Sequence, residues 1–126
     1  MEKSFELFNK AQEFLKPYRE FMSETQCREL IHKAGIQTFP RPVNIPQNFR
    51  VKISDRGAGM VYFHPKHNHT SIRVMPGKPH SPWPYQQKPY VVQMKNGKII
   101  DKSGNIVLRD APEAHIPLEE FVFTGD

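Results

Sequence analysis

The sequence predicts an α+β protein in which two helices come first and a group of antiparallel strands follows. Apolar residues recur at helical spacing in the first third of the chain, whereas period-two and β-branched patterns dominate from Phe49 onward. The length of 126 residues suits one domain. We assign residues 1–38 to a helical segment and residues 39–126 to a basic antiparallel-sheet domain, and we expect the two to form one compact unit.

Two helices are predicted before residue 36. The apolar positions of the first recur at helical spacing: Phe5, Phe8 and Leu15. Pro17 is expected to end or kink this helix. The second helix is expected to start after Ser23, which has the spacing of a capping box with Gln26, and to stop at Gly35.

Short strands are predicted in the rest of the chain, after a proline-containing linker over residues 39–46. Their expected ranges are 49–54, 60–64, 71–75, 90–94, 98–101 and 106–109. Asn96-Gly97 is a strong signal for a two-residue hairpin turn. The stretch from residue 76 to residue 89 holds five prolines, so it is expected to be a functional loop held in place by Trp83 and Tyr85.

Charge is sorted along the chain, although the net charge is only +5. Residues 41–109 contain twelve basic and two acidic residues, and no carboxylate occurs between Arg56 and Ile100. The same window contains tyrosine, phenylalanine, tryptophan and four histidines. A cationic and aromatic stretch suits a surface that holds phosphates and stacks bases, so RNA is the leading predicted partner.

Several other classes of protein are disfavoured. The single cysteine, Cys27, excludes an internal disulfide and is expected to be buried. No apolar run approaches the length of a membrane span, and the first residues lack a signal-peptide pattern, so we expect no membrane partner and a cytoplasmic site of action. Walker, GxSxG and HExxH motifs are absent, and no cofactor is predicted.

A succession of short motifs resembles the C-terminal toxin domains of polymorphic bacterial toxins of the Rhs and contact-dependent-inhibition kind. These motifs are GAGMVY (57–62), IRVMPG (72–77), SPWP (81–84), PYV (89–91), NG (96–97), DKSGN (101–105) and PEAHIPL (112–118). The resemblance implies a small cytotoxic ribonuclease with a compact antiparallel sheet, similar to the metal-independent RelE-like and colicin-type ribonucleases. It also implies a cognate immunity protein with an acidic contact surface.

His115 is the first candidate for proton transfer, because histidine takes up and releases protons near neutral pH. Pro112 and Pro117 are expected to hold its segment extended, which would place Glu113 beside it as an orienting group. Arg73 is expected to point away from its apolar strand neighbours and to grip a phosphate. Each has an alternative structural role: His115 can pin the C-terminal strand, and Arg73 can be an ordinary solvated residue or pair with Glu113.

The other candidates flank these residues. His80 and Lys88 are expected to complete the catalytic set, unless they are loop surface. The expected RNA-binding residues are Lys52, Arg56, Lys78, Trp83 and Tyr85, although the two aromatics can equally anchor their loop to the core. A weaker alternative is a transition-metal site formed by three closely spaced histidines: His64, His67 and His69.

Taken together, the sequence favours a toxin-like, metal-independent endoribonuclease that cleaves RNA, with tRNA as one candidate substrate, through a 2′,3′-cyclic phosphate. Two alternatives stay open. The same surface can belong to a non-catalytic RNA-binding module, or the proline-rich loop can belong to a protein-interaction domain without a role in nucleic-acid binding.

Overall fold

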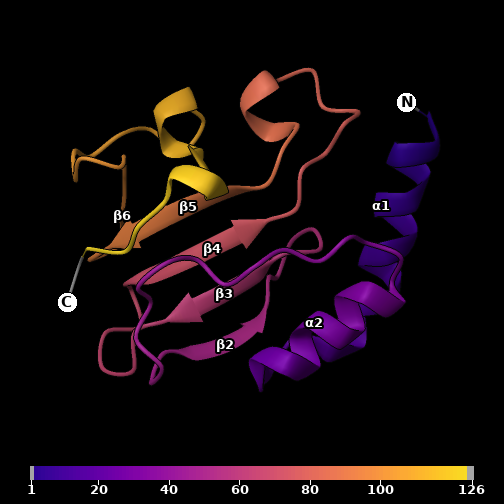
Figure 1. The fold of residues 1–126 in the computed structure, drawn as a ribbon, viewed down its shortest axis with the longest axis horizontal. Coiled ribbons are helices and arrows are strands. Elements are labelled where there is room, and N and C mark those ends of the chain that lie inside the picture. The colour runs from indigo at the N-terminus through magenta and orange to yellow at the C-terminus, as the bar shows by residue number, and fades with distance from the viewer. Residues whose placement is uncertain (1, 125–126) are drawn as a thin grey trace.

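The computed structural model describes residues 2–124, and these form two helices and a seven-stranded antiparallel sheet, whose first strand lies between the two helices in the chain and whose other strands follow them. The α+β prediction is therefore confirmed. Helices α1 (Glu2–Leu15) and α2 (Glu24–Lys33) lie together at one end of the sheet (Figure 1). A short 3-10 turn containing Pro17 follows α1, so the helix ends where proline was expected to end it.

The strands follow one another in the sheet almost in sequence order, β1-β2-β3-β4-β5-β6, while β7 also pairs with β5. Their bounds are β1 (Phe21–Met22), β2 (Arg50–Ile53), β3 (Met60–Phe63), β4 (Ser71–Met75), β5 (Tyr90–Lys95), β6 (Lys98–Ile100) and β7 (Ile116–Pro117). β6 and β7 occupy the same edge of β5, one beside each half of it. The chain between them therefore leaves the sheet at β6 and returns to it at β7.

Local signals set the ends of several elements as predicted. Ser23 and Gln26 form the expected capping box at the start of α2, and Gly35 adopts a φ of +90° just after its end. In the turn between β5 and β6, Asn96 and Gly97 have φ values of 51° and 80°. Positive φ at both central residues is the requirement of the tight hairpin turn that this pair of residues predicted.

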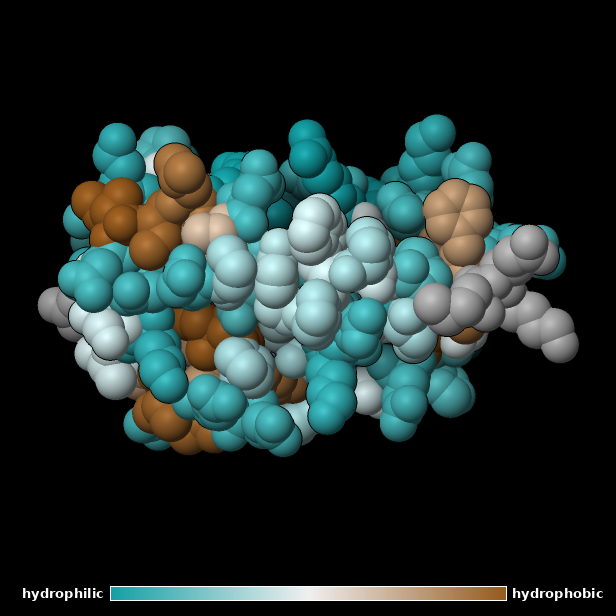
Figure 2. All heavy atoms as spheres, turned by 90° about the horizontal axis from the view of Figure 1, so that it is seen from above, coloured by the Kyte–Doolittle hydropathy of each residue, from teal (hydrophilic) through white to brown (hydrophobic). Residues whose placement is uncertain are grey.

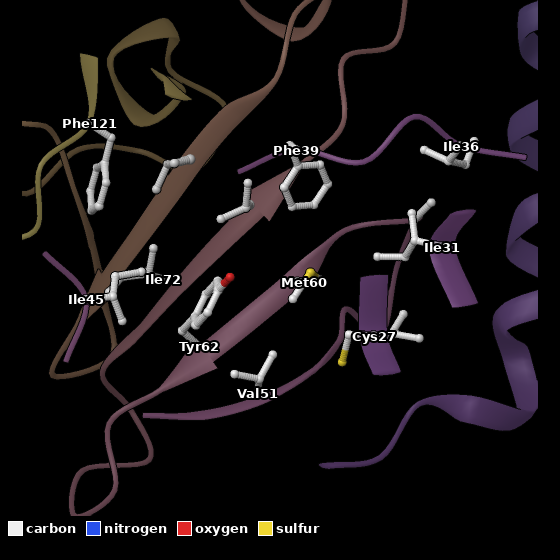
Figure 3. Packing of buried hydrophobic residues seen from close by; sticks show 14 of the residues in the cluster. Cys27, Ile31, Ile36, Phe39, Ile45, Val51, Met60, Tyr62, Ile72 and Phe121 are labelled. Carbon is white, nitrogen blue, oxygen red and sulfur yellow. The ribbon is translucent and has the colours of Figure 1, made fainter. Parts of the chain in front are cut away.

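The hydrophobic core lies between one face of the sheet and the covering formed by α2 and the linker after it (Figure 3). Ile72 and Val74 of β4 are fully buried on this face, and Phe39 and Ile45 reach it from the linker. Cys27 of α2 is also fully buried, and burial raises the pKa of its thiol to about 11. The thiol is therefore an unreactive part of the core.

Two segments differ from the prediction. Residues 106–109 form no strand; only Ile106 makes an isolated bridge, to Ile100, and Leu108 is 81% exposed. Alternating apolar residues there predicted a half-buried strand, but their pairing with β6 stops after this bridge and one hydrogen bond of 3.0 Å from the Val107 amide to the Ile99 carbonyl. Pro112–Ala114 form a 3-10 turn, not an extended segment, because proline is well suited to the first position of a helical turn.

A network of polar side chains joins α2, the linker after it and β3. Glu24 bonds Arg28 at 2.8 Å and Arg41 at 2.5 Å, and it accepts a hydrogen bond of 2.7 Å from the hydroxyl of Tyr62. Burial alone raises the pKa of the Glu24 carboxyl, but the Tyr62 hydrogen bond and the two arginines outweigh it, so that the pKa is lowered overall. Removing the carboxylate leaves two arginines without their partner.

We expect Glu24→Gln to lower the free energy of unfolding by about 2–4 kcal/mol at pH 7, because a partly buried ion pair loses one member. The lowered carboxyl pKa means that this stabilisation is present above the unfolded-state pKa and disappears as pH falls through the folded-state pKa. Urea unfolding should therefore show the difference between wild type and variant shrinking below about pH 4. Glu29→Gln, on an exposed part of the same helix, is the matched control and should have little effect at either pH.

Candidate functional site

A cavity of about 180 Å³ lies on the face of the sheet opposite the core. Its floor is formed by alternate residues of the two neighbouring strands β4 and β5: Ser71, Arg73, Met75, Tyr90, Val92 and Met94. The register places Arg73 directly opposite Val92, with Met75 opposite Tyr90. Because side chains alternate along a strand, the same period of two that buries Ile72 turns Arg73 into the cavity.

The surroundings of Arg73 in this cavity disfavour the positive charge of its guanidinium. Its Nε atom is buried and has no hydrogen-bond partner, although the rest of the side chain is partly accessible. Burial lowers the pKa of its guanidinium, and the positive charges of Arg109 and Arg56 lower it further. A buried donor without a partner is a candidate to bind an acceptor atom of a ligand. An oxyanion would supply both the missing acceptor and the missing negative charge.

Three further cations line the same cavity: Arg56, Lys78 and Arg109. They come from the β2–β3 connection, the proline-rich loop and the segment after β6. Within residues 2–124 none of these three, nor Arg73, forms a salt bridge with a carboxylate. Asp110 is the one acidic residue on the lining. Four arginine or lysine side chains around so small a space favour binding of a phosphate or another polyanion.

His115 lies at the edge of the cavity, just before β7. The 3-10 turn over Pro112–Ala114 brings its ring back over its own backbone, so that Nδ1 lies 2.9 Å from the carbonyl oxygen of Ala111. A carbonyl can only accept, so Nδ1 carries the proton and donates this bond. The neutral imidazole then has its lone pair on Nε2, where it can accept a proton from a substrate.

Aromatic rings fix the plane of this imidazole. The centroid of the His115 ring is 4.7 Å from that of Tyr85 and 5.1 Å from that of Tyr90. Tyr90 lines the cavity beside it, and burial raises the pKa of the Tyr90 phenol, although Arg73 partly opposes this effect. The phenol therefore keeps its proton at neutral pH and can donate a hydrogen bond, or the proton itself, to a bound oxyanion.

Hydrogen bonds within the proline-rich loop hold its conformation and extend to His115, whereas Trp83, which was expected to anchor the loop, is 54% exposed. The Ser81 hydroxyl donates to the side-chain oxygen of Gln86 at 3.1 Å, and the backbone amide of Trp83 donates to the same hydroxyl at 3.1 Å. The Gln86 amide nitrogen lies 3.5 Å from Nε2 of His115. Ser81, buried in the loop, thus orients an amide that faces the candidate base.

For the ribonuclease activity that the sequence predicts, we expect Gly77→Ala to reduce RNA cleavage by about 10- to 100-fold, because small displacements of reacting groups have effects of this size. A Cβ at Gly77 would lie 2.4 Å from the Gln87 carbonyl oxygen and 2.6 Å from the Cα of Lys88. The loop would have to shift, and Gln86 with it. Cleavage rates of purified variants provide the measurement. Gly104→Ala, where an added Cβ meets no atom within 4 Å but a φ of +88° strains the alanine, should lose some stability and cleave like wild type.

The structure brings part of the predicted site together. Four of the predicted residues line the cavity: Arg56, Arg73, Lys78 and His115. Tyr85 contacts the ring of His115 and stacks at 6.2 Å on Trp83, which is 54% exposed and does not line the cavity. Lys88 lines a separate groove.

Three predicted residues lie elsewhere. The ring of His80 packs against Phe5 and Phe8 of α1 and does not line the cavity. Lys52, on β2, forms a salt bridge of 3.3 Å with Asp55, which follows that strand. Glu113 was expected to orient His115, and this expectation is wrong. The segment forms a 3-10 turn and not an extended strand, so Glu113 is exposed. The carbonyl group of Ala111 accepts the hydrogen bond that orients His115.

The three closely spaced histidines do not form a metal site. Nδ1 of His64 accepts hydrogen bonds from the backbone amides of Lys66 and His67, so it helps to close the β3–β4 turn. Across the part of the chain that the structure describes, no three His, Cys, Asp or Glu side chains are grouped so that they could hold a metal ion.

Sequence reasoning missed three residues of the site: Tyr90, Gln86 and Arg109. The period of two in β5 could have identified Tyr90, since it faces the same side as Val92. Arg109 was assigned to a strand that does not form. No pattern in the sequence indicates that Gln86 faces His115.

The face of the molecule seen in Figure 2 is mostly hydrophilic, and most of its hydrophobic residues gather toward the end at which β6 lies. No helix within residues 2–124 is long and apolar enough to cross a membrane. Comparisons with protein-family models, curated proteins and solved structures find no match to this chain. The resemblance to toxin domains therefore rests on the sequence motifs, and the likeness to RelE-type folds stays a prediction.

Proposed function

We propose that this protein is an endoribonuclease that cleaves RNA at the cavity over β4 and β5 without the help of a metal ion. The observation that carries the proposal is the buried, unpartnered Nε of Arg73 in a cavity shared with His115. One group supplies positive charge for a phosphate, and the other supplies a base. These are two of the three requirements of metal-independent RNA cleavage, the third being an acid that protonates the leaving 5′ oxygen.

In the proposed reaction, Nε2 of His115 takes the proton of a ribose 2′-hydroxyl. The 2′ oxygen attacks the adjacent phosphorus, and the bond from phosphorus to the 5′ oxygen breaks. The products are a 2′,3′-cyclic phosphate and a 5′-hydroxyl end. Arg73, with Arg56, Lys78 and Arg109 around it, stabilises the additional negative charge of the phosphorane. Tyr90 gives its proton to the leaving 5′ oxygen, and the proton that His115 has taken returns to Tyr90 through solvent, so that both groups regain their starting states.

The function in a cell follows from the motif resemblance and is part of the proposal. A cytotoxic ribonuclease that acts in the cytoplasm would require a cognate inhibitor. Because the cavity is lined by four cations and one carboxylate, such an immunity protein would present acidic side chains to it.

The proposal is tested by incubating purified protein in EDTA with an RNA and with the DNA of the same sequence. We expect the RNA to be cut and the DNA to stay intact, because only RNA carries the 2′-hydroxyl. RNA that is bound in a salt-dependent manner but never cut would show a non-catalytic RNA-binding module instead. Absence of salt-dependent binding would favour the third alternative, a protein-interaction domain.

A further inference from the structure

An apolar groove of about 490 Å³ lies outside the catalytic cavity. It is formed where three segments meet: the linker after α2, the end of the proline-rich loop and the chain after β7. Ring side chains dominate its walls: Pro40, Pro42, Pro84, Tyr85, Pro89 and Pro117. The rigid rings of proline and tyrosine give it flat apolar surfaces that need no rearrangement on binding.

The groove is connected to the catalytic cavity through one side chain. Tyr85 lines the groove, and its ring centroid lies 4.7 Å from that of His115, which lines the cavity. Lys88 also lines the groove, is exposed, and forms no salt bridge within residues 2–124. An RNA strand with its phosphate at Arg73 would therefore have an apolar site beside it and a free cation for the next phosphate.

We propose that this groove holds the base of a nucleotide next to the scissile phosphate, and this inference rests on the proposed ribonuclease function. A nucleobase is flat and mostly apolar on its faces, so it packs against aromatic and proline rings regardless of its identity. Glu119, the one carboxylate on the lining, accepts hydrogen bonds from an exocyclic amino group. The groove thus favours cytosine over uracil.

Base binding is measured with short 2′-O-methyl oligonucleotides, which lack the attacking hydroxyl and so are not cleaved. Fluorescence anisotropy compares oligocytidylate with an abasic oligonucleotide of equal length. We expect oligocytidylate to bind about 5- to 100-fold more tightly, as base stacking contributes in other single-strand binding proteins. The ratio of the two affinities measures the contribution of the bases alone, because both oligonucleotides carry the same phosphates.

Val43→Glu places a carboxylate in the groove, and Val122→Glu is its matched control. Val43 lines the groove and is 54% exposed; Val122 is its bridge partner, is 48% exposed and lies outside the lining. Both variants should fold. In each, repulsion between the added carboxylate and the phosphates should weaken binding of the two oligonucleotides to a similar extent. We expect Val43→Glu to reduce the ratio to less than about 2-fold, and Val122→Glu to keep the wild-type ratio. Glu119→Ala should bind oligocytidylate and oligouridylate equally.

The outcomes separate this inference from the function on which it rests. Salt-dependent binding with no difference between oligocytidylate and the abasic probe would overturn the groove proposal and leave the ribonuclease proposal intact. A ratio that Val43→Glu does not change would also overturn it, and would leave the groove as a site for a protein. If neither probe binds, both proposals fail.

Discussion

His115→Ala is expected to slow RNA cleavage by about 10²- to 10⁴-fold, the usual contribution of a positioned proton carrier. The Nδ1 bond to the Ala111 carbonyl leaves the lone pair on Nε2, where the 2′-hydroxyl proton would replace the long 3.5 Å contact with the Gln86 amide; alanine removes this acceptor. RNA binding should change little, because the four cations of the cavity stay in place. Single-turnover cleavage rates and RNA affinity, measured on the same preparation, provide the test.

The matched control for this prediction is His69→Ala. His69 is an exposed histidine of the β3–β4 connection and does not line the cavity, so its removal should leave cleavage unchanged. If His115→Ala cuts RNA as fast as wild type, His115 has only a structural role. A large loss of thermal stability in His115→Ala would likewise indicate that the ring mainly holds β7 against β5.

Arg73→Met is expected to reduce cleavage by about 10²- to 10³-fold while raising the free energy of unfolding by about 1–3 kcal/mol. Burial and two neighbouring arginines disfavour the folded guanidinium, and its Nε has no partner. Methionine fills similar space without a charge. The opposite signs of the two effects are characteristic of a residue that is retained for function at the expense of stability.

Urea unfolding and single-turnover kinetics of Arg73→Met measure the two effects. Arg50→Met is the control: Arg50 is exposed on β2 and its guanidinium lies 3.8 Å above the ring of Phe21. This variant should lose a little stability and keep full activity. Should Arg73→Met instead unfold more easily than wild type, the guanidinium would be part of the structure and not a poised phosphate ligand.

Local patterns predicted the regular elements because each depends on a short stretch of sequence. The capping box at Ser23 and the turn at Asn96-Gly97 require only neighbouring residues, and both occur where expected. The orientation of Arg73 followed from the alternation of β4 alone. The failures depend on partners distant in sequence. Residues 106–109 have strand-like composition, yet their pairing with β6 is limited to a single bridge at Ile106 and one hydrogen bond from Val107.

The site was only partly predictable for the same reason. Sequence proximity suggested Glu113 as the partner of His115, but the 3-10 turn selects the carbonyl of Ala111. His80 lies in the expected loop, yet its ring packs on α1 because the helix lies beside that loop. The contact between Gln86 and His115 joins residues 29 positions apart. Such contacts follow from the packing of the loops, which local patterns do not determine.

The chemistry of the cleaved ends is the most direct measurement of whether His115 activates a ribose hydroxyl. An RNA of defined sequence is digested in EDTA, and the product termini are identified by mass spectrometry. The proposed mechanism predicts 2′,3′-cyclic phosphate and 5′-hydroxyl ends, and no cut at a position where one 2′-hydroxyl is replaced by hydrogen. Products with 5′-phosphate ends, or cleavage at the deoxy position, would contradict it.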